Sequence, residues 1–265
     1  MDYRTSPKIA VLYHCHPIND GVANLNFFLR QQVNPEIDYF ISTVDVNPLN
    51  ICSHSCNAEI VPVENDSHDY GGFARVLQSN TMVCDYDYYF FINSSCIGPF
   101  LPAYYDYDWT AAFIGQMVDG VEAVGSTINC LPMESPYSQL LLKGQLAPPY
   151  YHIQTYAYCL SRKALDFLQS VSFFRAPTNW NKTETILNYE ILLSKILTMA
   201  GMNIAALAAG YQGLDFSQQS EKTLILEKIG DPCFPSAIFG RSLSRFETIF
   251  VKPTRNYENL SDVIY

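Results

Sequence analysis

The sequence has no run of apolar residues long enough to cross a membrane, and residues 1–8 lack the apolar stretch of a secretory signal peptide. It also has little charge: 16% of the 265 residues are charged, with 16 lysines and arginines against 26 aspartates and glutamates. The formal net charge of −10 disfavours nonspecific binding to nucleic acid or an anionic membrane, because both need an excess of basic residues. We therefore expect a cytoplasmic protein with neither a membrane span nor a nucleic-acid partner.

Several nucleotide- and metal-binding motifs are missing as well. Neither the Gly-x-Gly-x-x-Gly spacing of a dinucleotide-binding fold nor a P-loop is present. The eight cysteines are scattered through mostly apolar stretches, so we expect free buried thiols rather than a disulfide framework. Cys52, His54 and Cys56 form a local cluster, but no second pair follows at the spacing of a zinc site. The sequence therefore does not predict structural zinc.

Three short apolar strands open the chain. They are predicted at residues 8–13, 37–44 and 58–63, and each ends in polar or ionisable residues. Apolar residues at helical spacing over residues 24–32 place a helix between the first two strands. This order indicates a β-α-β beginning and a parallel sheet. With 48% hydrophobic residues, the chain can bury the core of one large α/β domain.

The next predicted strand carries the most informative sequence in the chain. Residues 88–92 are aromatic or β-branched and form one buried strand, which the polar run Asn93-Ser94-Ser95 ends abruptly. Open α/β sheets bind ligands at the C-terminal ends of their strands, so these small polar side chains are candidates for a ligand site. An ordinary turn is the alternative, because asparagine and serine are common turn residues.

A second candidate site lies earlier in the chain. Gly71 and Gly72 are expected to precede a short helix, where they would let a ligand approach the backbone. The helix N-terminus offers unpaired N–H groups, and Arg75 offers a positive charge for a phosphate. A plain turn before a helix would explain the same residues.

The second half of the chain alternates strands, loops and helices. The clearest helix is predicted over residues 183–199, with Gly201 as its end. A long excursion over residues 133–149, with a short helical stretch at residues 138–143, is typical of a lid or binding loop. Further strands are predicted at residues 122–129 and 152–160, a strand or extended piece at 203–208, and an extended segment at 247–251.

Five segments of the chain share a pattern known from one enzyme family. They are Phe90–Pro102, Val124–Cys130, His152–Thr155 with Ser161–Leu165, Tyr189–Ser194, and Phe239–Lys252. In this order they resemble GT-A-type glycosyltransferases, soluble enzymes of microbial capsule and cell-surface glycan synthesis that also occur in fungi and large algal viruses. Each segment alone is a weak signal, whereas five in order span nearly the whole chain. The resemblance implies an α/β fold with a GT-A-like mixed, mainly parallel sheet flanked by helices.

The resemblance also implies a single domain with two functional halves. Residues 1–100 would bind a nucleotide-sugar donor, and residues 101–265 would bind a glycan acceptor and include a C-terminal extension. Most enzymes of the family hold Mn²⁺ or Mg²⁺ with an Asp-x-Asp at the position that reads Asn93-Ser94-Ser95 here. Neutral side chains bind a divalent cation weakly, so we predict no metal ligand and expect neither Mn²⁺ nor Mg²⁺ to be essential.

Donor binding then depends on other groups. Without a metal, the leaving nucleoside diphosphate needs other positive charge, and Arg75, Arg241 and Lys252 are the candidates. Asp45 and the loop 64–66 follow strands, where they could hydrogen-bond a uracil or ribose or merely cap a helix. The predicted donor-binding set is Asp45, Asp69, Gly72, Arg75, Asn93, Ser94, Ser95, Arg241 and Lys252.

An inverting transfer also needs a carboxylate that takes the proton from the acceptor hydroxyl. Glu190 lies in the matching helical segment and is the first candidate, with Glu184 second. A structural role on the helix is the alternative for both. His152, Gln154 and Thr155 are candidates for contacts to the sugar hydroxyls of the acceptor.

We therefore expect a glycosyltransferase that moves a hexose or pentose from a UDP- or GDP-linked donor to a hydroxyl of a glycan. The missing Asp-x-Asp motivates an alternative, a catalytically inactive relative that binds sugars or nucleotides as a binding or scaffolding module. A nucleotidyltransferase of similar architecture is disfavoured, because the chain lacks the N-terminal glycine-rich, basic signature that holds a triphosphate.

Overall fold

The computed structural model describes residues 6–31, 34–47, 51, 58–79, 85–175, 179–218 and 220–255. Nine strands form its two sheets: β1 (Ile9–Cys15), β2 (Ile37–Thr43), β3 (Ala58–Pro62), β4 (Tyr88–Asn93), β5 (Val121–Gly125), β6 (Ile128–Leu131), β7 (Tyr150–Ile153), β8 (Ala157–Ser161) and β9 (Asn203–Ala206). The larger sheet has the order β3-β2-β1-β4-β8-β5-β9, and β6 pairs with β7 in a separate two-stranded sheet.

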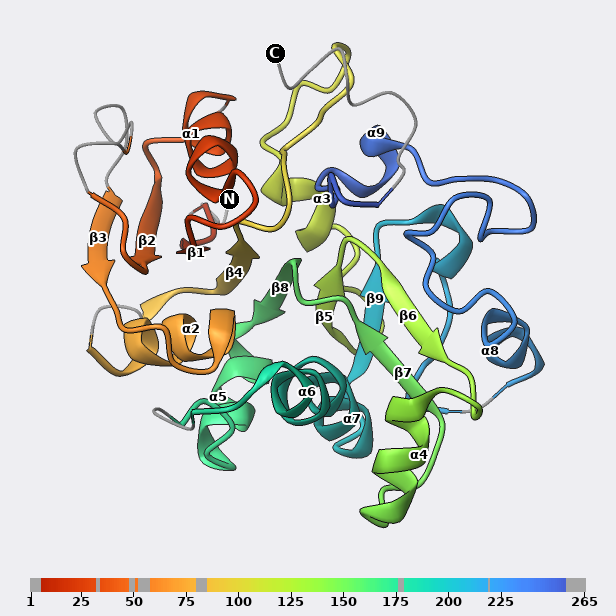
Figure 1. Cartoon of the computed structure of the whole chain (residues 1–265). Helices are drawn as coiled ribbons and strands as arrows, with labels where there is room; N and C mark the ends of the chain where they lie inside the picture. Colours follow the sequence, from red (N-terminus) through yellow and green to blue (C-terminus); the bar gives the residue numbers. More distant parts are fainter. Residues whose placement is uncertain are drawn as a thin grey trace, which may run out of the picture.

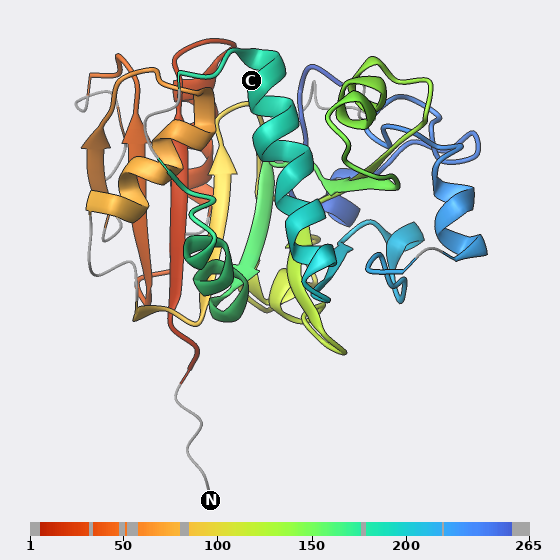
Figure 2. The same cartoon turned by 90° about the horizontal axis from the view of Figure 1, so that it is seen from below.

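Helices cover both faces of the larger sheet (Figure 1). Helices α1, α3 and α9 lie on one face, whereas α2, α5 and the continuous helix α6–α7 lie on the other (Figures 1 and 2). A π-helical stretch, Ile186–Ile191, joins α6 to α7, and a short 3₁₀ turn spans Ala209–Tyr211. The α-helices are α1 (Gly21–Gln31), α2 (His68–Ser79), α3 (Thr110–Ile114), α4 (Pro136–Lys143), α5 (Arg162–Ser170), α6 (Lys182–Thr185), α7 (Leu192–Met199), α8 (Glu221–Leu226) and α9 (Arg245–Thr248).

The larger sheet is mixed and mainly parallel, as predicted. Strands β3, β2, β1 and β4 are parallel neighbours, and β5 and β9 pair in parallel. Strand β8 runs antiparallel to both of its neighbours, β4 and β5. Because helices cover both faces, strand β1 is buried along its whole length, and its residues 9–13 form one apolar run.

Strand β4 is fixed by aromatic packing on both faces of the sheet. Phe90 contacts Trp109 on one face, with ring centroids 4.9 Å apart. Phe91 points to the other face and stacks between Tyr158 and Phe174, at 4.8 and 5.6 Å. Burying one such ring contributes about 2–3 kcal/mol relative to leaving it exposed. The C-terminal tip of β4 is therefore held in place, because the residues just before it are well packed on both faces of the sheet.

Some sequence-based boundaries are wrong because apolar runs hide a change of sheet. The predicted strand 122–129 is β5 followed by β6, and the predicted strand 152–160 is β7 followed by β8. In both cases the first and second halves belong to different sheets. The extended segment predicted at 247–251 is also wrong: α9 covers its start, with the Ser244 side chain as the N-cap, and Val251 forms a single bridge to Ile97.

The paired glycines lie inside α2 rather than before it, which corrects the prediction. A Cβ at Gly71 would lie 1.6 Å from the carbonyl oxygen of Asp66, and a Cβ at Gly72 would lie 2.1 Å from Nδ1 of His14. Gly71 is thus required by the close approach of the loop before α2, and Gly72 by the packing of α2 against the end of β1.

The described cysteines are free and buried, as predicted: Cys15, Cys96, Cys130, Cys159 and Cys233. The cluster 52–56 lies outside the described residues. Within the part of the chain that the structure describes, no helix combines the length and apolar character needed to cross a membrane.

Candidate functional site

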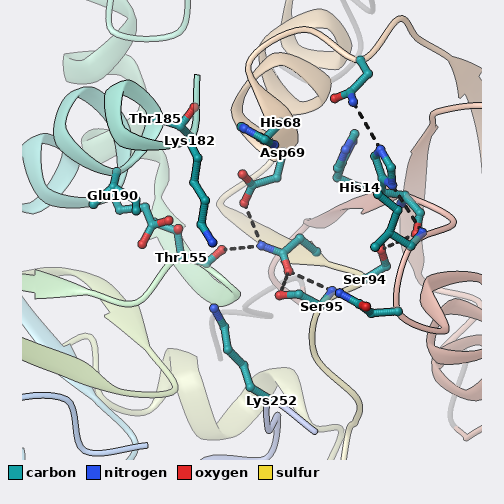
Figure 3. Close-up of a pocket in the computed structure, with 16 residues that line it drawn as sticks. His14, His68, Asp69, Ser94, Ser95, Thr155, Lys182, Thr185, Glu190 and Lys252 are labelled. Carbon is teal, nitrogen blue, oxygen red and sulfur yellow. Dashed lines mark hydrogen bonds between the residues drawn. The ribbon is translucent and has the colours of Figure 1, made fainter. Parts of the chain in front are cut away.

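A pocket of about 480 Å³ lies at the C-terminal ends of β1 and β4, between α2 and the helix α6–α7 (Figure 3). This is the edge at which open α/β sheets bind ligands, and the volume lies within the range of small-molecule sites. The lining residues are His14, His16, Ile18, Asn19, Asn65, His68, Asp69, Asn93, Ser94, Ser95, Thr155, Lys182, Thr185, Ile186, Glu190 and Lys252.

Asn93, at the tip of β4, connects the two halves of the pocket floor. Its side-chain N–H donates to the Asp69 carboxylate at 2.7 Å and to the Thr155 carbonyl at 3.4 Å. Its side-chain oxygen accepts from the backbone N–H and the hydroxyl of Ser95. The amide therefore orients Asp69 and leaves Ser95 exposed at the rim.

The hydroxyl and the carbonyl of Ser94 both form hydrogen bonds within the protein. Its hydroxyl accepts from the backbone N–H of His16 at 3.0 Å, and its carbonyl accepts from the Asn24 side chain at 2.9 Å. A Cβ at Gly21 would lie 2.8 Å from this hydroxyl and 1.8 Å from the His16 carbonyl. Ser94 therefore joins the ends of β1 and β4 and shapes the pocket from behind.

Four ionisable residues form what we call the charged side of the pocket: Asp69, Lys182, Glu190 and Lys252. Burial raises the pKa of Glu190 to about 7; Lys252 and Lys182 oppose this rise, whereas Asp69 adds to it. Burial also raises the pKa of Asp69, and the Asn93 hydrogen bond and Lys252 oppose that shift. Glu190 is therefore a carboxyl group that exchanges a proton near neutral pH.

The backbone around Glu190 is irregular. The residue lies in the π-helical stretch, a conformation that is rare and often found at functional sites. The loop before α2 fixes the segment that leads into α6. The Asp66 carboxylate accepts a hydrogen bond from the backbone N–H of Asn179, and the Ser67 hydroxyl accepts one from the backbone N–H of Trp180. The Tyr70 ring packs on Trp180 with centroids 4.6 Å apart. These contacts hold the charged groups of α2 and α6 across from one another.

Lys252 reaches the pocket from the C-terminal segment. Val251 and Ile97 exchange two backbone hydrogen bonds, of 2.9 and 3.0 Å, which attach this segment to the loop after β4. The Lys252 ammonium lies 5.4 Å from the centre of the Tyr156 ring. This bridge places a cation beside Asp69 and Glu190, whose pKa values it lowers.

Two histidines and an asparagine form the opposite wall, which we call the histidine side: His14, His16 and Asn65. His14 is 3% exposed, and burial lowers its pKa to about 3, with smaller contributions from His16 and His68. The Asn65 side chain lies 3.3 Å from Nε2 of His16. Figure 3 shows His14 on one side of the pocket and Lys182 and Glu190 on the other.

The pocket wall contains two carboxylates, Asp69 and Glu190. Among the described residues, no three histidine, cysteine, aspartate or glutamate side chains gather in a group that could hold a metal ion. Asp69 is the carboxylate next to the β4 tip, and it is bonded to Asn93 and faces Lys252. Asp87 lies at the opposite end of β4 and accepts from the Lys8 N–H, and Asp108 accepts from the backbone N–H and the hydroxyl of Thr110 at the start of α3. The described residues therefore supply no complete set of ligands for Mn²⁺ or Mg²⁺ by themselves.

The structure brings together about half of the residues predicted from sequence. The pocket wall contains Asp69, Asn93, Ser94, Ser95, Thr155, Glu190 and Lys252. The other predicted residues do not line it: Asp45, Gly72, Arg75, Glu184, His152, Gln154 and Arg241. The binding and catalytic roles of both groups stay predictions.

The residues outside the pocket have structural partners or face solvent. Gly72 makes room for the His14 ring. Asp45 and Arg75 are exposed. Glu184 accepts from the backbone N–H of Asn181 and so completes the N-terminal cap of α6.

Arg241 lies 3.7 Å from Glu247, with 68% of its side chain exposed. His152 is buried, which lowers its pKa to about 4.

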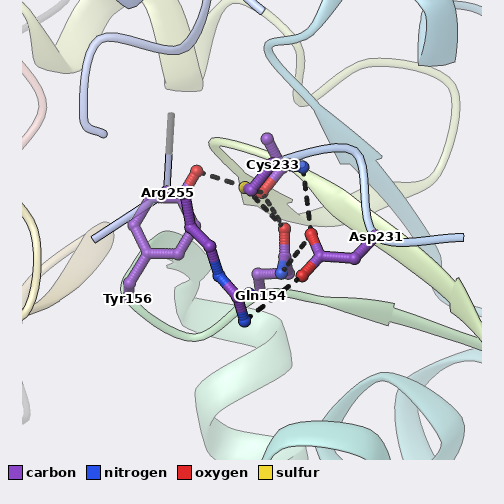
Figure 4. A network of polar contacts seen from close by, with 6 residues as sticks. Gln154, Tyr156, Asp231, Cys233 and Arg255 are labelled. Atoms are coloured by element: carbon purple, nitrogen blue, oxygen red, sulfur yellow. Dashed lines mark hydrogen bonds and ion pairs between the residues drawn. The ribbon is translucent and has the colours of Figure 1, made fainter. Parts of the chain in front are cut away.

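Gln154 belongs to a separate polar network (Figure 4). Its side-chain N–H donates to Asp231 at 3.1 Å, and its oxygen accepts from Thr127 and Cys233. Arg255 lies 3.7 Å from the second oxygen of Asp231. The network attaches the segment after α8 to the turn between β7 and β8, so the Gln154 amide is already occupied.

Five further residues of the pocket wall were not predicted from the sequence: His14, His16, His68, Lys182 and Thr185. His14 and His16 follow a predicted strand, and their position after its end is what could have indicated them as site residues. Lys182 and Thr185 carried no signal, because only the fold brings α6 opposite β4.

No protein-family model and no curated protein matches this sequence. Similar solved structures include a mannosyltransferase from Pyrobaculum calidifontis in complex with GDP-mannose and Mn²⁺, with a TM-score of 0.46 and 9% identity over 77% of this chain and 55% of that one. The bifunctional glycosyltransferase WbbM gives a TM-score of 0.48 and 11% identity, over 97% of this chain and 47% of that one.

A third similar structure is the glucosyl-3-phosphoglycerate synthase of Mycobacterium tuberculosis, with a TM-score of 0.39 and 14% identity over 74% of this chain and 82% of that one. The chain spans about half the length of the first two structures. These similarities concern the arrangement of the sheet and helices and identify no residue of the pocket.

Proposed function

We propose that this protein is a glycosyltransferase that moves a sugar from a UDP- or GDP-linked donor to a hydroxyl of a glycan acceptor. The observation that carries the proposal is the charged side of the pocket, where a carboxyl group with a pKa of about 7 faces two lysines at the ligand-binding edge of the sheet. The five sequence segments that resemble GT-A enzymes support the same activity.

In this proposal Glu190 acts as the general base of an inverting transfer. The acceptor oxygen forms a bond to the anomeric carbon of the donor sugar as the bond from that carbon to the diphosphate oxygen breaks. The acceptor proton passes to the Glu190 carboxylate, and the bonding electrons leave with the nucleoside diphosphate. A base whose pKa lies near the working pH is well suited to this transfer.

Lys182 and Lys252 would stabilise the charge that develops on the leaving diphosphate. Both line the pocket, and both lower the pKa of Glu190, so their charge is felt at the reacting group. Asp69 would not bind the diphosphate directly. Its carboxylate accepts from Asn93 and faces Lys252, which makes it a positioning residue for that lysine.

The proposed reaction has no step that passes through a metal ion. The Asn93 amide donates a hydrogen bond, where a carboxylate would offer oxygen ligands, and lysines face the same space. We therefore propose that Mn²⁺ and Mg²⁺ are not essential for transfer.

Calorimetric titration with UDP- and GDP-sugars, together with release of nucleoside diphosphate measured with EDTA, with Mn²⁺ and with Mg²⁺, tests this function. We expect one donor class to bind and to turn over in all three conditions. Binding without turnover under any metal and acceptor would favour the inactive relative, and the absence of any nucleotide-sugar binding would refute a donor site.

A further inference from the structure

Lys252 and Arg255 are the two ends of one turn in the C-terminal segment. The backbone N–H of Arg255 donates to the carbonyl of Lys252 at 3.0 Å, which is the hydrogen bond of a β-turn. The Lys252 side chain lines the pocket, whereas the Arg255 guanidinium lies 3.7 Å from the Asp231 carboxylate. Contacts that hold Arg255 in place therefore also hold the backbone of Lys252.

Two groups hold the Arg255 side chain. Its guanidinium lies 4.3 Å from the centre of the Phe234 ring, within the range of a cation–π contact, and it points to Asp231 (Figure 4). The side chains of Arg255 and Asp231 are 37% and 14% exposed. Solvent and salt screen such a partly buried ion pair less than one on the open surface. The pair therefore fixes the C-terminal end of the turn.

Asp231 is in turn attached to the floor of the pocket. One of its carboxylate oxygens accepts from the Gln154 side chain at 3.1 Å and from the backbone N–H two residues further on at 3.0 Å. Gln154 is followed by Thr155, which lines the pocket, and by Tyr156, whose ring centre lies 5.4 Å from the Lys252 ammonium. The short turn between β7 and β8 thus carries both an anchor for Asp231 and the ring on which Lys252 packs.

Glu190 responds to the charges at both ends of this arrangement. Burial raises its pKa; Lys252 and Lys182 oppose this rise, whereas Asp69 and Asp231 add to it. The protonation of Glu190 therefore reports where the Lys252 ammonium lies.

We propose that Arg255 and Asp231 are positioning residues: their ion pair holds the turn 252–255 so that the Lys252 ammonium faces Glu190 and the diphosphate of the donor. Neither Arg255 nor Asp231 is among the residues that line the pocket, so both act through Lys252. The inference rests on the proposed function for the presence of a diphosphate. The placement of Lys252 beside Glu190 is measured without any donor.

Substitution of Asp231 tests the inference by the sign of its effect. Asp231→Asn keeps the shape of the side chain and the oxygen that accepts from Gln154, but it removes a negative charge. Loss of that charge alone would tighten the binding of an anion, whereas a displaced Lys252 would weaken it. We expect inorganic pyrophosphate, measured by calorimetry, to bind about threefold or more weakly to the variant. In a Lys252→Met background the same substitution should cause no loss.

Two results of this experiment would overturn the inference. Tighter or unchanged binding of pyrophosphate in Asp231→Asn would mean that the ion pair does not place Lys252. An equal loss in the wild-type and Lys252→Met backgrounds would mean that the pair supports the fold as a whole, because a residue that acts through Lys252 has no effect once Lys252 is removed.

Carbon-13 spectra of glutamate-labelled protein test the placement of Lys252 with no ligand present. Glu190→Gln assigns the signal of the Glu190 carboxyl group, whose pKa is then measured in the wild type and in Arg255→Met. We expect the variant to raise this pKa, because Lys252 moves away, and Arg255→Lys to restore it in part. Most of the rise should be absent when Arg255→Met is made in a Lys252→Met background.

An unchanged pKa of Glu190 in Arg255→Met, or the same rise in both backgrounds, would overturn the inference. Asp231→Asn and Arg255→Met break the ion pair from opposite ends, so the inference stays testable if one variant fails to fold. If the wild type binds no pyrophosphate but the carboxyl titration gives the expected result, the proposed contact of Lys252 with a diphosphate fails and its placement by Arg255 and Asp231 stands.

Discussion

Burial shifts the pKa of an ionisable group on each side of the pocket, but in opposite directions. Burial disfavours the charged form of any ionisable group, so it lowers the pKa of His14 to about 3 and raises that of Glu190 to about 7. The imidazole is therefore neutral at ordinary pH. The carboxyl group becomes one that changes charge near neutral pH. One side of the pocket therefore holds a buried neutral group, and the other holds a group that changes charge near neutral pH.

The largest effect should come from removing the base on the charged side. Glu190→Gln keeps the size of the side chain but cannot accept a proton, so we expect turnover to fall roughly 10²- to 10⁴-fold while donor binding persists. Initial rates of nucleoside diphosphate release and calorimetry measure the two quantities.

Glu184→Gln is the matched test of the second candidate base. Its side chain caps α6 outside the pocket, so we expect turnover to change by less than about threefold. A loss in Glu184→Gln as large as that in Glu190→Gln would contradict the assignment.

Removing one cation from the charged side should have the next largest effect. In Lys252→Met the diphosphate loses a charged contact, and we expect donor affinity to fall roughly 10- to 100-fold. Arg241→Met removes the other candidate cation of the C-terminal motif, which lies outside the pocket and next to Glu247. We expect a change below about twofold there, and equal losses in the two variants would refute the pocket geometry.

A smaller effect is expected from crowding the histidine side. In Gly72→Ala the new Cβ would lie 2.1 Å from Nδ1 of His14 and 2.8 Å from the Ser42 hydroxyl, so the ring must move. We expect a loss of about 1–3 kcal/mol in the free energy of unfolding, together with weaker binding of nucleoside diphosphate. Gly210→Ala is the control, because a Cβ there meets no atom within 4 Å. Denaturant unfolding that shows no difference between the two variants would contradict this packing.

The pH dependence should show the smallest effect and the most specific one. Since the base must be ionised, kcat/KM should rise with pH up to about pH 7 and then level off. Lys252 lowers the pKa of Glu190, so Lys252→Met should move the midpoint of this rise to higher pH. A midpoint that moves to lower pH, or stays in place, would mean that another group controls the profile.

Sequence alone predicted much of the fold, because the parallel strands and the helix over residues 183–199 have strong local patterns. It also found the tip of β4, where a polar tripeptide follows an apolar strand. It could not find the contacts around that tip. The bond between Ser94 and His16 joins residues 78 positions apart, and Lys252 reaches the site through a bridge between Val251 and Ile97. No spacing in the sequence encodes such neighbours.

Other features were missed for local reasons. A π-helical stretch interrupts the helix at Glu190, and a search for the ordinary helical period reads straight through it. Gly72 was interpreted as a position where a ligand approaches the backbone, whereas a histidine ring occupies that space. The same small residue serves either purpose, and only the neighbours distinguish them.

A structure of the protein with a bound donor tests the division of the pocket most directly. We expect the diphosphate to lie by Lys182 and Lys252 and the anomeric carbon of the sugar to face Glu190. A donor bound in the reverse direction, or outside this pocket, would contradict it.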